Sequence, residues 1–156
     1  MSGGLLPGSG DGAAAPMTPG ACLFCQIVRG EMAALAVFED DLTFAFLDHR
    51  PLFPGHTLLV PRVHHETLED LPGDLLSPLF GSAQRLAGAV EKAMGAAGTF
   101  VAINNKVSQS VPHLHVHIVP RRPRDGMKGF FWPRVPYASP EHAAETQAAI
   151  RAALEA

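Results

Sequence analysis

Three histidines alternate with aliphatic residues in the segment that runs from His113 to Val119. Successive side chains of a β-strand point to opposite faces, and each residue advances the chain by roughly 3.3 Å. A strand over 113–119 therefore places the three imidazoles on one face and Leu114, Val116 and Ile118 on the other. The pattern predicts a strand with one face packed in a core and the other face available for chemistry.

The rest of the chain predicts an α+β fold with a mostly antiparallel sheet, one long helix and a C-terminal helix. Asp40-Asp41 separates two β-prone runs and indicates a hairpin turn, and Gly95 follows the long amphipathic run as a helix cap. Ser139-Pro140 marks the start of the last helix, with serine as N-cap and proline in the first turn. Strands are expected at 36–39, 43–47, 56–60, 99–103 and 113–119, and helices at 74–94 and from 140 to about 154.

Composition limits the partners that the chain can bind. With 156 residues, 47% of them hydrophobic, the chain has enough apolar material for the core of one ordinary domain. A net charge of −3 argues against broad binding of a nucleic acid polymer, which needs a strong basic excess. Five of the twelve Lys and Arg residues fall within 121–134, where they indicate either a site for a small phosphate ligand or a solvated loop.

The N-terminal segment and the cysteine count bear on location. Residues 1–20 are rich in Gly, Ala and Pro and hold no Lys or Arg, so we expect a disordered tail. The sequence shows no signal-peptide pattern and no apolar run of roughly 20 residues, which predicts no membrane association. Only two cysteines are present, Cys22 and Cys25, and this usage predicts a cytoplasmic protein.

Three interpretations of the histidine face are open from the residues alone. The imidazoles could simply line a half-exposed strand, although strict alternation of three argues against this. They could bind a catalytic metal, but alternate Cβ atoms lie nearly 7 Å apart, so a third histidine in series reaches the same ion poorly. In the favoured interpretation one neutral imidazole attacks phosphorus and forms a labile phosphoramidate. Hydrogen-bond donors before the strand and arginines after it suit that chemistry.

These residues closely resemble the signature of the histidine triad (HIT) family of nucleotide-binding hydrolases and transferases, which is His-φ-His-φ-His-φ-φ. The supporting blocks span about residues 22 to 122 in the order of the family. They are Cys-Leu-Phe-Cys-Gln-Ile-Val-Arg-Gly-Glu at 22–31, Phe-Leu-Asp at 46–48, Pro-Gly-His-Thr-Leu-Leu-Val-Pro at 54–61 and Gln-Ser-Val at 109–111.

The resemblance implies the domain plan and the partners. A HIT domain is expected over 21–137, followed by a C-terminal helix over 138–156. Members of the family look like α+β domains, usually homodimers that join their sheets edge to edge and pair their long helices. A purine nucleotide such as AMP is the implied ligand.

The resemblance also implies roles for individual residues. His115 becomes the nucleophile that attacks the α-phosphate, His117 contacts that phosphate, and His56 completes the hydrogen-bond network on the phosphate side. Asp48 falls where the family binds the ribose hydroxyls, although it could instead be a simple loop cap. His49 adds an imidazole at the ribose edge. No metal is expected in the chemical step.

Two further groups complete the expected nucleotide site. Apolar side chains are expected to enclose the purine, and uncharged polar side chains to hold the phosphate and the leaving group. The apolar group consists of Phe24, Ile27, Phe46 and Leu47, and the polar group of Asn104, Asn105, Gln109 and Ser110.

The Cys-x-x-Cys pair allows three interpretations from the residues: a redox dithiol, two inert buried thiols, or half of a structural zinc site. A redox pair normally opens a helix after a strand, and nothing in the sequence indicates that setting here. Some members of the family complete such a zinc site with two histidines. In this chain that resemblance implies zinc at Cys22, Cys25, His64 and His113, with His65 as the neighbouring alternative to His64.

The chain departs from the family pattern in three places. The first is His49-Arg50 at the ribose edge, where an aliphatic or small residue is common. The loop 105–109 is short and lacks glycine, which makes the leaving-group side of the site uncertain. The block 128–134, Lys-Gly-Phe-Phe-Trp-Pro-Arg, predicts either a packing segment or a substrate-facing lid. The predicted function is hydrolysis or transfer at the α-phosphate of a purine nucleotide conjugate, with a phosphoramidate or a dinucleoside polyphosphate as substrate. A phosphorylase, a nucleotide sensor or scaffold and a zinc-dependent hydrolase are the alternatives.

Overall fold

The computed structural model describes residues 20–127 and 134–155, in two units that divide between Pro123 and Arg124. The predicted tail, except residue 20, and the block 128–134, except Arg134, lie outside the described residues. The expected boundary between 137 and 138 stays a prediction.

The first unit is built on a five-stranded antiparallel sheet with the order β1-β2-β3-β5-β4. The predicted α+β class, with one long helix and a C-terminal helix, is confirmed. In chain order the elements are α1 (Leu23–Val28), β1 (Ala36–Glu39), β2 (Thr43–Leu47), β3 (Thr57–Pro61), α2 (Gly73–Met94), β4 (Gly98–Ile103) and β5 (Val116–Arg121).

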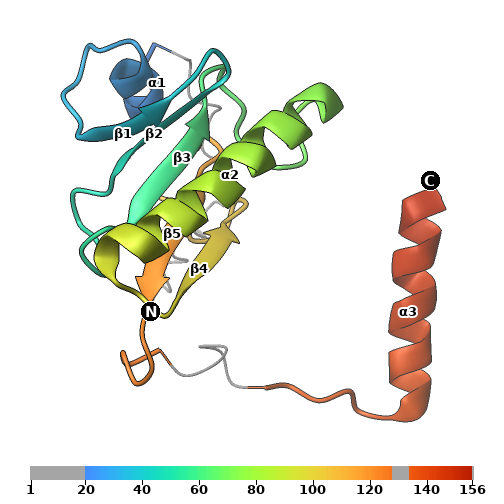
Figure 1. Cartoon of the computed structure of the whole chain (residues 1–156). Coiled ribbons are helices and arrows are strands. Elements are labelled where there is room, and N and C mark those ends of the chain that lie inside the picture. Colours follow the sequence, from blue (N-terminus) through green and yellow to red (C-terminus); the bar gives the residue numbers. More distant parts are fainter. Residues whose placement is uncertain (1–19, 128–133, 156) are drawn as a thin grey trace, which may run out of the picture. The chain divides into compact units, whose positions relative to one another are not determined.

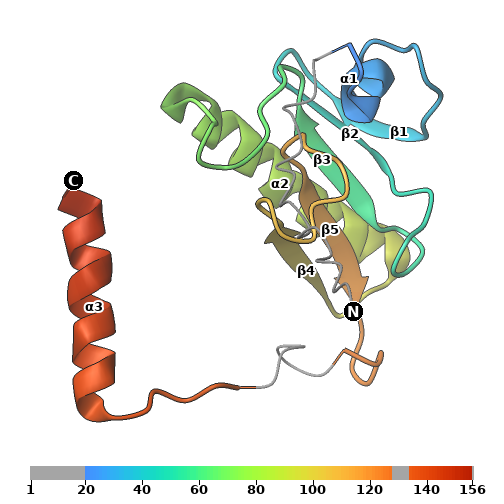
Figure 2. The same ribbon diagram turned by 180° about the vertical axis from the view of Figure 1, so that it is seen from behind.

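The two faces of the sheet pack against different parts of the chain. Helix α2 lies across one face, over β3, β5 and β4 (Figure 1). Leu114, Val116 and Ile118 are buried on that side in a core with the inner residues of α2. On the opposite face lie α1 and the loop between β4 and β5 (Figure 2), and a second core there joins Phe24 of α1 to Phe46 and Leu58 of the sheet.

Local interactions explain the predicted turns. The carboxylate of Asp40 accepts hydrogen bonds from the backbone N–H groups of Leu42 and Thr43, at 2.9 and 2.7 Å, and so closes the hairpin between β1 and β2. Gly95 ends α2 in the left-handed conformation with φ of +56°, which glycine adopts without steric cost.

The histidine segment differs from its prediction in one respect. The ladder of β5 begins at Val116, not at 113, because the preceding residues bond elsewhere. The N–H of His113 donates to the carbonyl of Val111, and the N–H of Leu114 donates to the carbonyl of His65. The alternation still holds, since Leu114 and Val116 pack under α2 while His115 and His117 line a cavity on the other face.

The second unit contains α3 (Pro140–Glu155). The hydroxyl of Ser139 accepts a hydrogen bond from the N–H of His142 at 3.1 Å, which confirms the predicted cap. None of the described helices combines the length and the apolar composition that crossing a bilayer demands. The expected cytoplasmic location stays a prediction.

Candidate active site and metal-binding cluster

A cavity of about 800 Å³ opens on the face of the sheet that carries α1. Its walls come from α1, from 32–35, from β2 and from the residues around the start of β5. Of the residues predicted for the site, the cavity is lined by Phe24, Ile27, Phe46, Leu47, Asp48, His49, Ser110, His115 and His117.

His115 and His117, which line the cavity, and His56, which contacts His117, are held in the neutral state. Burial lowers the pKa of both His56 and His115. Burial lowers the pKa of His117 to about 4, and the nearby rings of His115 and His56 add to the shift. The carboxylate of Asp48 acts in the opposite direction on all three. Each imidazole therefore carries one proton near pH 7, and the tautomer decides which nitrogen has the lone pair.

The tautomer of His115 follows from its partner. Nδ1 of His115 lies 2.7 Å from the carbonyl oxygen of His113, and a carbonyl can only accept, so Nδ1 carries the proton. Nε2 then holds a lone pair, which is the form that a nucleophile needs. The ring is 2% exposed and packs edge-on against Phe24, with 5.1 Å between the ring centroids.

The tautomers of His56 and His117 follow in the same way. The backbone N–H of Leu52 donates to Nδ1 of His56 at 3.2 Å, so the proton of His56 is on Nε2. This Nε2 lies 3.0 Å from Nδ1 of His117 and donates to it. Nε2 of His117 consequently bears the remaining proton and is a hydrogen-bond donor next to His115, whose ring centroid is 4.8 Å away.

Asp48 and His49 stand where β2 ends, at the edge of the cavity. The Asp48 carboxylate accepts a hydrogen bond from the N–H of Arg50 at 2.9 Å, so the loop-cap role is present. Its side chain is 18% exposed and its second oxygen lies 3.6 Å from Nδ1 of His56. This carboxylate thus keeps acceptor capacity at the cavity edge. His49 is 85% exposed, 3.8 Å from Asp48.

The loop between β4 and β5 places its predicted polar residues differently. The side-chain amide of Gln109 donates to the carbonyl of Glu66 at 2.6 Å and accepts from the N–H of Lys106 at 2.8 Å. Asn105 accepts from the N–H of Leu68 at 2.9 Å. These side chains brace the loop and, like Asn104, are not among the residues that line the cavity, whereas Ser110 is. Their expected contacts with phosphate stay predictions.

Two residues of that loop have positive φ angles although neither is glycine. Lys106 has φ of +66° and Ser108 has φ of +59°. Residues other than glycine pay roughly 1–2 kcal/mol for this conformation. The bonds of Gln109 across the loop are the interactions that hold it there.

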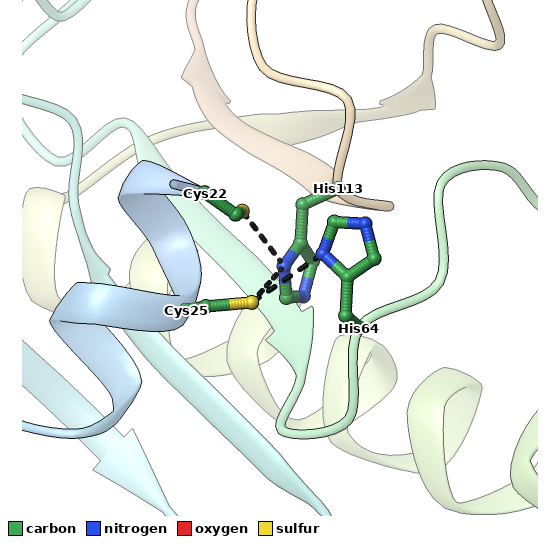
Figure 3. A group of neighbouring side chains, drawn as sticks. All are labelled: Cys22, Cys25, His64 and His113. Carbon is green, nitrogen blue, oxygen red and sulfur yellow. Dashed lines mark hydrogen bonds between the residues drawn. The ribbon is translucent and has the colours of Figure 1, made fainter. Parts of the chain in front are cut away.

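A second group of side chains gathers beside the cavity. Cys22 and Cys25 come from the start of α1, His64 from the loop after β3, and His113 from the segment before β5, and all four point toward one another (Figure 3). Their ligand atoms all lie within 4.8 Å of one another. Sγ of Cys25 is 3.3 Å from Nδ1 of His64 and 3.5 Å from Nδ1 of His113. Sγ of Cys22 is likewise 3.5 Å from Nδ1 of His113.

The donor set fits tetrahedral zinc. Zn–S bonds near 2.3 Å and Zn–N bonds near 2.0 Å at tetrahedral angles put sulfur and nitrogen about 3.5 Å apart. Nε2 of His113 lies 2.9 Å from the carbonyl of Pro61, to which it donates, so Nδ1 is free to ligate. Burial lowers the pKa of His113 to about 4, and burial together with Cys22 raises the pKa of the Cys25 thiol to about 11. A positive ion in the cluster removes the cost of a thiolate there.

The structure also decides between the two adjacent histidines. His64 belongs to the cluster, whereas His65 does not, and the carbonyl of His65 serves the N–H of Leu114 instead. The two thiols are free, and the pair does open a helix, contrary to the sequence expectation. No described strand precedes that helix, which leaves the thioredoxin-like setting without support.

Sequence reasoning missed part of the cavity wall. Met32, Ala33, Ala34 and Leu35 line it together with Leu23, Pro51, Leu58 and Val111. The apolar residues 32–35 follow neither a strand nor a helix periodicity. Their apolar character alone could have pointed to them.

Comparison with known proteins decides the family. The HIT domain family model matches residues 29–124, more than half of the chain. The chain belongs to the HIT family. The predicted resemblance is therefore confirmed.

Two curated relatives of this HIT protein carry named activities. An adenylylsulfatase of Arabidopsis thaliana, HINT3, is 37% identical over 120 residues, which are 75% of this chain and 61% of the relative. The match thus spans less than two thirds of that protein. An adenosine 5'-monophosphoramidase of Saccharomyces cerevisiae, HNT1, is 36% identical over 116 residues, which are 72% of this chain and 70% of the relative.

A solved structure bears on the metal cluster. A zinc-bound histidine triad family protein from Mycobacterium smegmatis is 32% identical to this HIT protein, with a TM-score of 0.67 over 85% of this chain and 99% of the other. In this chain, the four residues of the Cys-His cluster could hold a metal ion.

Proposed function

We propose that this HIT protein catalyses hydrolysis or nucleotidyl transfer at the α-phosphate of a purine nucleotide conjugate, most simply an adenosine one, through a nucleotidyl intermediate on His115. The observation that carries the proposal is the hydrogen bond from Nδ1 of His115 to the carbonyl of His113. This bond leaves the lone pair on Nε2 of a buried, neutral ring at a cavity wall, which is the arrangement that covalent catalysis by histidine needs.

The remaining side chains supply the other parts of the reaction. Nε2 of His115 forms a bond to the α-phosphorus while the bond to the leaving group breaks. His117 donates from Nε2 to the phosphate or to the departing atom, and His56 holds His117 in that tautomer. Water then cleaves the P–N bond and releases the nucleoside monophosphate. No step uses a metal.

The ends of the cavity suit the two halves of a nucleotide. The apolar side chains of Phe24, Ile27 and Phe46 enclose the base, and Asp48 accepts hydrogen bonds from the ribose hydroxyls. Ser110 lies toward the phosphate and the leaving group. The relatives named adenylylsulfatase and monophosphoramidase support sulfate and amine as leaving groups; a polyphosphate leaving group is a further candidate.

Replacement of the nucleophile tests the proposal. We expect His115→Asn to lose turnover of adenosine phosphoramidate and adenylyl sulfate but to retain AMP binding by calorimetry. Intact mass spectrometry after acid-free quenching should show an AMP adduct on the wild type only. His142→Asn, on α3, is the matched control and should keep the adduct. Unchanged turnover in His115→Asn contradicts the nucleophile assignment.

A zinc ion at Cys22, Cys25, His64 and His113 is part of the proposal and has a structural role. The four residues close a tetrahedral set, which leaves no open position for a substrate. This separates the proposal from a zinc-dependent hydrolase. Activity should therefore survive exchange of zinc for cadmium, which retains the fold, and loss of turnover in the folded cadmium protein would favour the metal-dependent alternative.

A nucleotide sensor or scaffold is the second candidate function. Assays with a panel of nucleotide conjugates that differ in the leaving group separate it from an enzyme. If all conjugates with amine, sulfate, fluoride and polyphosphate leaving groups turn over at the rate of His115→Asn, the site binds without catalysing. A clear ranking by kcat/KM supports the enzyme and identifies its leaving group.

A second copy of this chain is the proposed partner. Among the described strands β4 has a neighbour on one side only, and its Val101 is 44% exposed. Leu76 and Phe80, one turn apart on α2, are 40% and 44% exposed. An open edge pairs readily with its own copy about a two-fold axis. Sedimentation equilibrium should give twice the 16.6 kDa chain mass, and Val101→Glu should give the monomer. A monomeric wild type contradicts the proposal.

A further inference from the structure

The segment Cys22-Leu23-Phe24-Cys25 serves two sites at once. Its outer residues belong to the metal-binding cluster. Its inner residues, Leu23 and Phe24, line the cavity. Cluster and cavity wall are thus interleaved within four consecutive residues, so neither can shift without moving the other.

Two contacts link the metal-binding cluster to His115, the proposed nucleophile. The ring of Phe24 lies between two histidines, with centroid distances of 6.0 Å to His113 and 5.1 Å to His115, and both contacts are edge-on. Separately, the carbonyl of the cluster residue His113 accepts a hydrogen bond from the Nδ1–H group of His115. One contact positions the ring and the other sets its tautomer.

The fold gives α1 little other support. It has six residues, which is far too short to be stable as a helix by itself. Cys22, its N-cap residue, provides no side-chain hydrogen bond to the helix backbone. Packing of Phe24 and Ile27 against the sheet holds one side of α1, and the Cys22 and Cys25 thiols anchor its start.

We propose that metal binding and nucleotide binding are thermodynamically coupled in this protein, with Phe24 as the positioning residue that joins the two sites. The proposal rests on the proposed function, because it requires that a nucleotide occupies the cavity. Metal at Cys22, Cys25, His64 and His113 fixes Phe24 against His115, and a base packed on Phe24 in turn fixes the cysteines. Since coupling is reciprocal, each ligand raises the affinity for the other by the same factor.

Because the coupling between zinc and AMP binding is reciprocal, binding measurements can test it without measuring turnover. The zinc dissociation constant is measured by chelator competition, with and without saturating AMP. We expect AMP to tighten zinc binding by about fivefold or more, the lower end of typical coupling factors. AMP affinity, measured by calorimetry at buffered high and low free zinc, should change by the same factor. AMP that binds without any effect on zinc affinity overturns the coupling and leaves the proposed function standing.

Variants locate the coupling. Phe24→Ala should still bind zinc, and saturating AMP should change its zinc dissociation constant by less than twofold. Phe24→Leu, which retains more side-chain volume, is the second variant in case Phe24→Ala fails to fold. Leu47→Ala is the matched control, since Leu47 lines the cavity from β2 and does not belong to the core cluster that contains the cysteines. This variant should weaken AMP binding but retain the full effect of bound AMP on zinc affinity. An equal loss of coupling in Leu47→Ala and Phe24→Leu overturns the role of Phe24. Failure of AMP to bind the wild type overturns the proposed function as well.

Discussion

The backbone N–H of Leu52 lies 3.2 Å from Nδ1 of His56 and donates a hydrogen bond to it. A backbone amide has no other role than donor, so this one contact determines which nitrogen of His56 carries the proton, and through His56 it determines the same for His117. Leu52 is 62% exposed, yet its backbone N–H thus orients the buried imidazole of His56 and, through it, the half-buried imidazole of His117.

Removal of that single donor should disturb the relay. Leu52→Pro lacks the N–H, and we expect a fall in kcat/KM of about fivefold, since one hydrogen bond contributes about 1 kcal/mol. ¹⁵N NMR of the histidine rings should show mixed tautomers at His56 and His117. Leu52→Ala keeps the N–H and should match the wild type in both measurements. Pure tautomers in Leu52→Pro contradict the role of this amide.

Zinc should stabilise the fold in a concentration-dependent way. A ligand that binds only the native state adds about 1.4 kcal/mol of unfolding free energy per tenfold rise in its free concentration above Kd. We expect thermal melts in zinc buffers to follow this slope for the wild type and to be flat for His64→Asn. His65→Asn, the adjacent residue outside the cluster, should retain the slope. Equal behaviour of the two variants would contradict the assignment of His64.

The depressed pKa of His117 predicts a loss of stability in acid. Between the unfolded pKa near 6.5 and the native value of about 4, the unfolded chain binds a proton that the native protein does not bind. Unfolding free energy therefore falls as pH falls through this window and is unaffected above it. In urea titrations, the unfolding free energy of the wild type minus that of His117→Asn should decrease as pH falls, by at most about 1.4 kcal/mol per pH unit. A difference that grows toward pH 4 contradicts the direction of the shift.

Gly55 should be intolerant of a side chain, and it precedes His56. It has φ of +96°, and an added Cβ would lie 2.7 Å from Cγ of Met94. We expect Gly55→Ala to cost about 2–3 kcal/mol of unfolding free energy, in the upper range for such backbone positions. Gly95→Ala has the positive φ without the contact and should cost about 1 kcal/mol. Chemical denaturation compares them, and equal costs would show that Met94 moves aside freely.

Local patterns were sufficient for much of the fold. The alternation at 113–119 predicted which side chains face the core, and the apolar spacing before Gly95 predicted the long helix within one residue. Asp40 closes its turn with its own neighbours, which is why a hairpin could be predicted there. In each case the interactions that decide the structure lie within a few residues along the chain.

Where the deciding partner is distant, the sequence was insufficient. The ladder of β5 starts late because Leu114 bonds to His65, a residue some fifty positions earlier. The amide of Gln109 is engaged by Glu66, which no local pattern indicates. Helix α1 is too short for a helical period to show, and the sequence did not predict it as a helix. The roles of the individual histidines and the full set of metal ligands, by contrast, came from the family resemblance.

The division of the histidine segment between two faces makes its length more constrained than its composition. Loss or gain of one residue inside 114–118 puts the residues on one side of the change on the wrong face, so that imidazoles turn toward the core under α2 or aliphatic side chains turn toward the cavity. A substitution here alters one face of the segment at one position, whereas a change of length disturbs both the core and the cavity. We therefore expect an inserted or deleted residue in this stretch to be more damaging than an exchange of one aliphatic residue for another.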